Sequence, residues 1–530
     1  MTNTWLVLLP TIIVLVSAFT IKRLLLSLSL GIISAALIAT DFSIVKIFPL
    51  IGTRFWQKIA DLENIYILSF IIILGIFVAL LAMTGGASAF AKIVNKRAKN
   101  AKMAETSSIL LSFALFIDDY LSNLKVGYIM RPITDKFKIP RVKLAFLVHS
   151  LAGALVIITP FSNWGAFISG QLNSSGISKD PSETIRIFAD PFFSYLKCIP
   201  FIFYSFLSIA TVIFIVQKRI SFGPMKKYED IAQETGNLQG GRTDIKAHEL
   251  EQTTNSQSSL LDLIIPLGTL ITSIITGFLY NGGFYLLGGT RSFSEALRNM
   301  ENPFLVVFVA GILTLTVSFL FALVRNKITL NKIPNVCISG TKMMIEPIVM
   351  ILLAWTMGKI LADDLQTGNY LASTLLGAIN IKFIPLILFI TSAICGIATG
   401  TSWGTMMLLI PIAIPMITGL LQLPVPTTLE QAAIVIPSLG AIFSGAICGD
   451  HISPISETTI MASMSSGCDP IDHAYTQMPY AVPAIIGCCV AFLLSGLFIN
   501  YSWWASSLGS FAISLVLTLG LLALFNKRAC

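Results

Sequence analysis

Residues 446–463 read AICGDHISPISETTIMAS, and this stretch interrupts a long apolar segment with two acids, a histidine and a proline. In a lipid bilayer, a backbone that leaves the helical hydrogen-bond pattern is tolerated only where it faces other protein or a water-filled cavity. Charged side chains at that depth are rare for the same reason, because their transfer from water is costly. The stretch therefore predicts a broken membrane helix whose polar residues line a buried site.

The whole chain has the composition of a membrane protein. Of its 530 residues, 55% are hydrophobic and 12% are charged, and long apolar runs recur from Trp5 to Phe525. A helix needs roughly 20 apolar residues to cross the hydrocarbon core. We therefore expect an all-α polytopic membrane protein with about 11 spans. The net charge of +8 comes from loops beside these runs, which indicates membrane orientation rather than nucleic-acid binding.

Two apolar segments are predicted to be re-entrant helical hairpins. Residues 106–130 have basic loops at both ends, so the segment should enter and leave on the cytoplasmic side, with its tip at IDDYLSN, residues 117–123. Residues 371–422 consist of two apolar arms broken at ATGTSWGT, residues 398–405, and lack dense basic clusters at their ends. The second hairpin should therefore enter from the opposite side.

The order of the elements predicts inverted repeats. Each hairpin is followed by a broken transmembrane helix, 144–169 or 432–466, and then by another helix. The other expected spans lie near 5–21, 24–40, 64–84, 192–216, 259–280, 303–324, 343–361, 479–499 and 503–526. The resulting organisation is N-terminal helices in 1–105, a first repeat core in 106–216, a flexible cytoplasmic linker in 217–258, connecting helices in 259–370, a second repeat core in 371–500 and a C-terminal helix in 501–530.

The polar breaks carry hard oxygen donors, which suit an alkali cation or a proton better than a soft metal. These candidates for cation and proton binding are Asp118, Asp119, Ser122, Asn123, Ser162, Asn163, Thr399, Thr401, Ser402, Asp450, Ser453, Ser456, Glu457 and Thr458. Burial favours the protonated form of a carboxylate, whereas a bound cation favours its ionised form. One carboxylate can therefore bind either H⁺ or a cation, and this competition is the simplest mechanism of exchange.

Less specific interpretations stay open for several of these residues. Asp118 and Asp119 would be ordinary solvated acids if the hairpin tip reached bulk water. Asp450 precedes Ser and Pro, a pattern that also caps helices. His451 and His473 are interpreted as structural hydrogen-bonding residues. The tryptophans of the SNWG and TSWG breaks are interpreted as packing residues without a chemical role.

Three long motifs resemble the NhaC family of Na⁺/H⁺ antiporters. They are FIDDYLSNLKVGYIMRPITDKFKIPRVKLA at 116–145, ATGTSWGTMMLLIP at 398–411, and GDHISPISETTIMASMSSGCDPIDHAYTQMPYA at 449–481. The resemblance implies a secondary antiporter that exchanges cytoplasmic Na⁺ for H⁺, a location in the bacterial inner membrane and no cofactor. It also implies that the acids, amides and hydroxyls of these motifs form the ion site.

Three residues depart from the pattern of that family. His149 stands where an aspartate is usual, Lys125 replaces an apolar residue, and Glu457 replaces a shorter aspartate. His149 is a possible proton carrier. Lys125 is either an internal cation that pairs with Asp118 or Asp119 when sodium is absent, or a side chain that extends along the hairpin to the cytoplasmic interface.

Two other functions would use some of the same sequence features. A Na⁺- or H⁺-coupled transporter of an organic solute, either a carboxylate or an amino acid, would need the same broken helices. A membrane aspartyl protease would use two acids, but the second motif reads ICGD rather than GxGD, so an enzyme is not expected. The chain has no phosphate-loop motif for ATP.

The expected partners are the lipid bilayer, Na⁺, protons, a small organic solute in the alternative, and a second copy of the chain in a homodimer.

Overall fold

The computed structural model describes residues 4–21, 23–179, 185–242, 259–298, 300, 302–375, 378–499 and 501–529. These residues are helical apart from loops and a short parallel pair of strands, β1 (Ile177–Ser178) and β2 (Ile187–Phe188). Ten helices are long and apolar enough to cross a membrane, or up to 11 spans if a bent pair counts as one more. The structure thus confirms an all-α polytopic membrane protein with about 11 spans.

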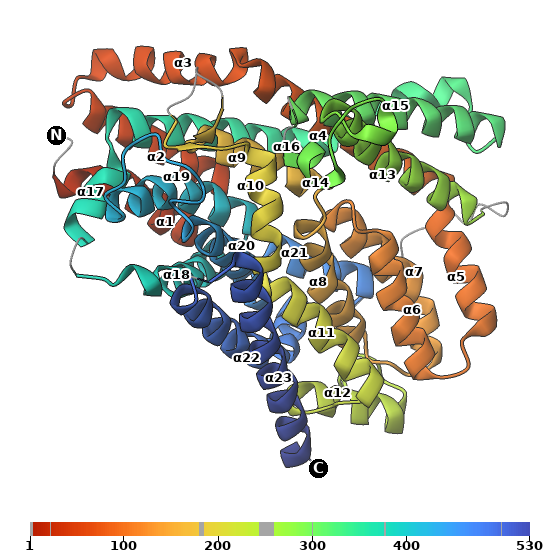
Figure 1. The fold of residues 1–530 in the computed structure, drawn as a ribbon. Coiled ribbons are helices and arrows are strands. Elements are labelled where there is room, and N and C mark those ends of the chain that lie inside the picture. Colours follow the sequence, from red (N-terminus) through yellow and green to blue (C-terminus); the bar gives the residue numbers. More distant parts are fainter. Residues whose placement is uncertain are drawn as a thin grey trace.

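The N-terminal and connecting helices pack together along one side of the molecule (Figure 1). Among them, α4 and α16 approach so closely that a Cβ atom on Gly75 would lie 2.6 Å from the carbonyl oxygen of Gly340. Small residues at such crossings let membrane helices pack backbone to backbone. The elements of this group are η1 (Trp5–Leu8), α1 (Leu9–Ile21), α2 (Leu24–Ala39), α3 (Ile44–Ala60), α4 (Leu62–Thr84), α5 (Gly86–Arg97), α13 (Leu261–Asn281), η3 (Tyr285–Leu287), α14 (Phe293–Arg298), α15 (Pro303–Val324), η4 (Leu330–Lys332), α16 (Ile333–Lys359) and η5 (Ile360–Asp364).

The first repeat contains the predicted hairpin, formed by α6 and α7 with a break at residues 115–118. Both ends of this hairpin bind the segment 217–233: Lys102 Nζ donates to the carbonyl of Gln217 at 3.0 Å, and Lys138 Nζ to that of Gln233 at 3.1 Å. The two ends therefore lie on the same side of the molecule. The elements are α6 (Ala101–Ala114), α7 (Asp119–Lys136), α8 (Arg141–Ile157), α9 (Asn163–Ser174), α10 (Pro191–Cys198), η2 (Ile199–Phe201) and α11 (Phe203–Lys218).

The second repeat contains the other hairpin, α18 and α19, which turns at Gly400. This residue has a φ of +66°, and a Cβ atom there would lie 2.9 Å from the carbonyl oxygen of Ile455, so glycine fits the turn. The elements are α17 (Thr367–Leu375), η6 (Ile381–Phe383), α18 (Ile384–Thr399), α19 (Ser402–Leu420), α20 (Val435–Ile452), α21 (Glu457–Ser466), α22 (Pro470–Leu497) and α23 (Trp503–Ala529).

Helices of the two repeats contact each other at the centre of the molecule. Helix α21 packs on α7 and α8, and in the corresponding arrangement α9 packs on α19. In Figure 1 the hairpins α6–α7 and α18–α19 lie on opposite sides, with the broken helices α8–α9 and α20–α21 between them. The predicted inverted repeats, with two hairpins and two broken helices, agree with this arrangement.

The predicted flexible linker is partly wrong. Within 217–258, residues Gly223–Thr235 form helix α12, whereas residues 243–258 lie outside the described part of the chain. Helix α12 docks through a buried ion pair, because Lys143 binds both Glu229 and Glu105, the latter at 3.0 Å. Met225 and Ala232 of this helix are also buried, so apolar packing and ion pairing together anchor it.

Three further boundaries differ from the prediction. The span expected at 192–216 is interrupted at η2, where Pro200 lacks the amide that a continuous helix requires. The second hairpin covers 381–420 rather than 371–422, because α17 is a separate helix packed along α19. Helix α3 was not predicted; it makes an angle of 118° with α2.

Helix α3 is anchored by Arg54, which forms ion pairs with two acids far away in the sequence, Asp363 and Asp364. Arg54 donates to both carboxylate oxygens of Asp364, at 2.7 and 3.0 Å. Val45 and Phe48 are exposed on its outer face. An amphipathic helix of this kind is typical of the interface between lipid and water.

Candidate functional site

The break in the first hairpin places two buried aspartates at the start of α7. Asp118 caps this helix, with its Oδ1 accepting from the amide of Leu121 at 2.7 Å. Its other oxygen accepts from the Asn163 amide group at 2.8 Å. Asp118 and Asp119 are 1% and 2% exposed, so neither is a solvated acid at the surface. The interpretation that the hairpin tip reaches bulk water is therefore wrong for this structure.

The start of α9 meets the same aspartates from the other side. The indole Nε1 of Trp164 donates to Asp119 Oδ1 at 3.1 Å. Ser162 caps α9 by accepting from the amide of Gly165 at 3.2 Å, so it orients the helix rather than facing the acids. Two helix N-termini thus converge on the aspartate pair, and their partial positive charges favour an anionic group. Sequence reasoning missed Trp164, because only the fold brings its indole to Asp119.

Three buried oxygen atoms beside this pair lack a hydrogen-bond partner within the described residues. They are Ser122 Oγ, Asn123 Oδ1 and Asn163 Oδ1. The amide nitrogens of both asparagines are occupied, by the Asp119 carbonyl at 3.0 Å and by Asp118. A buried polar atom without a partner is costly, and a bound cation would satisfy it. Two carboxylates with three neutral oxygens form a set that suits an alkali cation.

A second buried carboxylate lies at the end of α20. Asp450 accepts hydrogen bonds from Ser456 and from Thr458, whose Oγ1 lies 2.5 Å from Asp450 Oδ2. His149 on α8 reaches the same group, with its Nε2 3.5 Å from Asp450 Oδ2. Asp450 therefore does more than cap a helix: it is the acid at the centre of a polar cluster that joins both repeats.

His149, which stands where the family usually has an aspartate, makes contacts with residues of α21 and α22. His149 Nε2 is 2.9 Å from Thr458 Oγ1, and its Nδ1 lies 3.1 Å from His473 and 3.2 Å from Gln477. His451 contacts the hydroxyl of Tyr204 at 3.3 Å through its Nδ1. The prediction that His451 and His473 take part in hydrogen bonding agrees with these contacts, but both belong to the site rather than to a remote structural position.

A side-chain hydrogen bond between α7 and α21 links the two clusters. Tyr120, which follows Asp119, donates to Glu457 Oε2 at 2.6 Å. The amide of Glu457 in turn donates to the carbonyl of Gly400 at 3.4 Å, so the second hairpin tip meets the same residue. Glu457 therefore lies at the junction of both hairpins and the second broken helix.

The predicted hydroxyls of the second hairpin act mainly on the backbone. Thr399 and Ser402 donate to the carbonyls of Cys395 and Ala446, at 2.9 and 3.2 Å. Thr401 caps α19 by accepting from the amide of Gly404 at 3.4 Å. Ser453 donates to the carbonyl of Ile397 at 3.0 Å. Ser402 connects α19 to α20, Ser453 connects the end of α20 to α18, and none of these four hydroxyls is among the unpartnered oxygens.

Lys125 does not pair with either aspartate. Within the described residues no hydrogen bond or ion pair involves its ammonium group. It lines a cavity of about 400 Å³ between α4, α5, α7 and α13, together with Lys92 and Arg131. This cavity borders Leu115 and Leu121, on either side of the hairpin break, and no acidic side chain of the described residues lines it.

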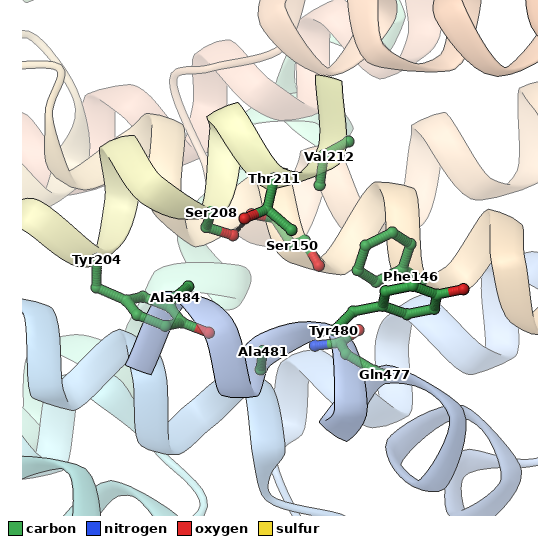
Figure 2. Close-up of a pocket in the computed structure, with 10 residues that line it drawn as sticks. All are labelled: Phe146, Ser150, Tyr204, Ser208, Thr211, Val212, Gln477, Tyr480, Ala481 and Ala484. Carbon is green, nitrogen blue, oxygen red and sulfur yellow. Dashed lines mark hydrogen bonds between the residues drawn. The ribbon is translucent and has the colours of Figure 1, made fainter. Parts of the chain in front are cut away.

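A second, much smaller cavity is shown in Figure 2, and two of its lining residues, Tyr204 and Gln477, contact histidines. It measures about 10 Å³ and is lined by polar and apolar side chains of α8, α11 and α22. Two lining atoms, Thr211 Oγ1 and Gln477 Oε1, lack hydrogen-bond partners within the described residues. At its far end Tyr480 accepts from the amide of Phe222, in the basic loop after α11. The volume is close to that of one water molecule, roughly 10–15 Å³ on the same measure.

Comparison with known proteins identifies the family. The profile of the Na⁺/H⁺ antiporter family matches residues 189–497, more than half of the 530-residue chain. The chain belongs to the Na⁺/H⁺ antiporter family. This confirms the resemblance found in the motifs, and it makes the protein a secondary transporter and a multi-pass integral membrane protein.

Three curated proteins are similar to this chain in sequence. An uncharacterised protein of Haemophilus influenzae is 31% identical over 525 residues, which cover 98% of this chain and 95% of that protein. The malate-2H⁺/Na⁺-lactate antiporter of Bacillus subtilis is 32% identical over 123 residues, 22% of this chain and 24% of that protein. An uncharacterised Na⁺/H⁺ antiporter of H. influenzae is 29% identical over 127 residues, 24% and 25% of the two chains.

Solved structures with a distant likeness are also transporters. The YdaH transporter of Alcanivorax borkumensis aligns with a TM-score of 0.45 at 15% identity, covering 87% of this antiporter-family chain and 90% of that one. MtrF of Neisseria gonorrhoeae, described as one of a class of antimetabolite efflux pumps, aligns with a TM-score of 0.43 at 14% identity, covering 86% and 85%.

Proposed function

We propose that this transporter exchanges cytoplasmic Na⁺ for H⁺ in the inner membrane of a bacterium. The observation that carries the proposal is the aspartate pair Asp118–Asp119 beside three unpartnered oxygens. Sodium would bind Asp119 and the oxygens of Ser122, Asn123 and Asn163. Protons compete for the same carboxylate, because a buried acid must be either protonated or paired with a cation.

Asp450 is the second proton-binding group in this proposal. Its carboxylate is held by two hydroxyls and faces His149, which can accept or donate a proton at Nε2. The contact between Tyr120 and Glu457 couples the two clusters mechanically, because one residue sits on the first hairpin and the other on α21. Broken helices of opposite repeats meeting at one point are typical of alternating-access transporters.

The small cavity in Figure 2 offers a route for protons. It connects the histidine cluster, through Gln477, with Tyr480 and the basic loop after α11. Basic loops face the cytoplasm. A water molecule there would find several polar partners, including the free Thr211 hydroxyl and the Gln477 amide oxygen. We infer that protons leave Asp450 for the cytoplasm through this water.

A second candidate function is coupled transport of an organic anion. The supporting observation is the cavity of about 400 Å³ that carries Lys92, Lys125 and Arg131 and borders the hairpin tip. Such a lining attracts carboxylates and repels free cations. The Bacillus subtilis relative is named for exchange of malate and lactate, although it aligns over only 22% of this chain.

Proteoliposome transport tests these functions directly. A pH-sensitive dye inside the vesicles reports proton flux when Na⁺, Li⁺ or K⁺ is added outside, and radiolabelled malate or lactate reports anion uptake. We expect Na⁺-driven proton flux that is abolished in Asp119→Asn and Asp450→Asn, because an amide keeps the shape but cannot exchange a proton. Glu430→Gln is the control, since Glu430 is 77% exposed and remote from both clusters. Wild-type flux in both aspartate variants would remove these acids from the mechanism.

A further inference from the structure

Three of the four histidines of the chain meet at one buried point. The ring centroid of His149 lies 4.9 Å from that of His451 and 5.2 Å from that of His473. They come from three helices, α8, α20 and α22, and all are at most 2% exposed. The exchange proposed above uses only His149 as a proton carrier, so it does not account for the presence of His451 and His473 beside it.

Two of these histidines are held at one nitrogen while the other nitrogen points to the carboxylate or lacks a partner. His149 is held at Nδ1 by His473 and Gln477, and its Nε2 faces Asp450. His451 is held at Nδ1 by the hydroxyl of Tyr204. Its Nε2 is buried and has no hydrogen-bond partner within the described residues. In metal-binding histidines the outer nitrogen donates its N–H to a second residue while the inner nitrogen binds the ion. His473 Nε2 can accept from His149 Nδ1, and the Tyr204 hydroxyl can accept from His451 Nδ1.

The distances between the inner atoms suit a small divalent ion. His149, Asp450 and His451 each offer one ligand atom, and these atoms lie within 4.8 Å of one another. Two ligands of a tetrahedral zinc ion, each bound at about 2.0–2.1 Å, are about 3.4 Å apart. The observed separation of His149 Nε2 from Asp450 Oδ2 is 3.5 Å.

We propose that His149, Asp450 and His451 form a binding site for a divalent first-row transition-metal ion such as Zn²⁺. Imidazole nitrogens select such ions, whereas alkali cations prefer oxygen alone. Thr458 Oγ1, 2.9 Å from His149 Nε2, or a water molecule would complete the coordination. Tyr204, His473 and Gln477 are positioning residues, which hold the two imidazoles through their outer nitrogens.

Metal binding at this point has a consequence for transport. The ion would occupy the carboxylate of Asp450, which also carries protons in the function proposed above. Zn²⁺ would therefore inhibit exchange in competition with protons. This consequence rests on the proposed function, whereas the binding itself does not, so the decisive measurement is made without transport.

The experiment uses the purified full-length protein without a histidine tag. We expect Co²⁺ to bind at one ion per chain and to produce the intense visible absorption of a four-coordinate ion, which zinc then displaces. Zn²⁺ should also raise the temperature of unfolding, because it binds the folded state alone. His149→Asn and His451→Gln should each lose the visible band and the thermal shift. His248→Gln is the matched control, since this fourth histidine lies outside the described residues and outside the proposed site.

A third variant with a smaller structural change keeps the test valid if His149→Asn or His451→Gln fails to fold. Tyr204→Phe keeps the ring but removes the hydroxyl that holds His451, so metal affinity should fall by about 10- to 100-fold while the visible band persists at saturation. The proposal is overturned if the wild type shows only weak six-coordinate Co²⁺ absorption, or if His149→Asn, His451→Gln and Tyr204→Phe bind as tightly as the wild type. Because no step measures ion flux, failure of the antiport function would leave these results unchanged.

Discussion

Tyr120 donates a hydrogen bond of 2.6 Å to Glu457, although the two residues are 337 positions apart. Tyr120 lies in the first turn of α7, and Glu457 is the first residue of α21. The contact therefore joins the tip of the first hairpin to the broken helix of the second repeat. It also gives a physical reason for the longer acid at position 457, because aspartate would be one methylene too short for this contact.

Substitution of Tyr120 or of Glu457 should lower the free energy of unfolding by the same amount. We expect Tyr120→Phe and Glu457→Asp each to lower the free energy of unfolding by about 1.5–3 kcal/mol, the range for a hydrogen bond to a charged group. The double variant should lose little more than either single one, as a double-mutant cycle in chemical denaturation would measure. Fully additive losses would show that the two side chains do not interact.

Sodium affinity should depend on pH. If Na⁺ and H⁺ compete for Asp119, the apparent Na⁺ affinity rises as pH increases, since fewer carboxylates are protonated. Measuring proton flux against Na⁺ concentration between about pH 6 and 9 checks this, with reconstituted Glu430→Gln as the unaffected comparison. An affinity that stays constant over that interval would contradict a shared site.

Removing the Thr211 hydroxyl from the small cavity should slow the passage of protons between Asp450 and the cytoplasm. Thr211→Val keeps the shape of the side chain but leaves the proposed water with one polar partner fewer. We expect a lower maximal rate of exchange with an unchanged apparent affinity for Na⁺, because the cation cluster is separate. Val212→Ala is the control: Val212 lines the same cavity without a polar group. Equal rates in Thr211→Val and wild type would place the proton route elsewhere.

Lys125 should matter for anions rather than for sodium. It lines the basic cavity and makes no ion pair with Asp118 or Asp119 within the described residues, so an internal-cation role has no contact to support it. We expect Lys125→Met to reduce uptake of radiolabelled malate or lactate several-fold while Na⁺-driven proton flux and its response to membrane potential persist. Lys99→Met, at an exposed position outside the cavity lining, is the control. A changed voltage response would instead favour the internal cation.

The first hairpin makes a prediction about membrane sides. Both of its ends bind the segment 217–233, so cysteines introduced at Lys96 and Lys138 should react with an impermeant thiol reagent from the cytoplasmic side only. The measurement compares right-side-out and inverted vesicles, in a background where the native cysteines do not react. Labelling from opposite sides would show a complete span and contradict the inverted repeats.

The sequence alone determined the class of fold and the position of the polar breaks. Apolar length and loop charge are local properties, so about 11 spans and the two hairpins could be predicted without tertiary information. Acids in apolar surroundings also indicated Asp118, Asp119 and Asp450 as candidates for the site, because a bilayer excludes charges that have no function or partner. Helices α3 and α12 were missed because they lack long apolar runs and are anchored by ion pairs such as Arg54–Asp364.

Only the tertiary structure decided which polar residues act together. Trp164 could not be assigned to Asp119, nor His473 to His149, because these pairs lie on different elements far apart in sequence. Thr399 and Ser402 have the same chemistry as Ser122, yet their hydroxyls bind backbone carbonyls, whereas that of Ser122 stays unpartnered within the described residues. Residue type states what a side chain can bind. The packing of the two repeats determines which partners lie within hydrogen-bond distance, and therefore which oxygens and nitrogens remain available for an ion.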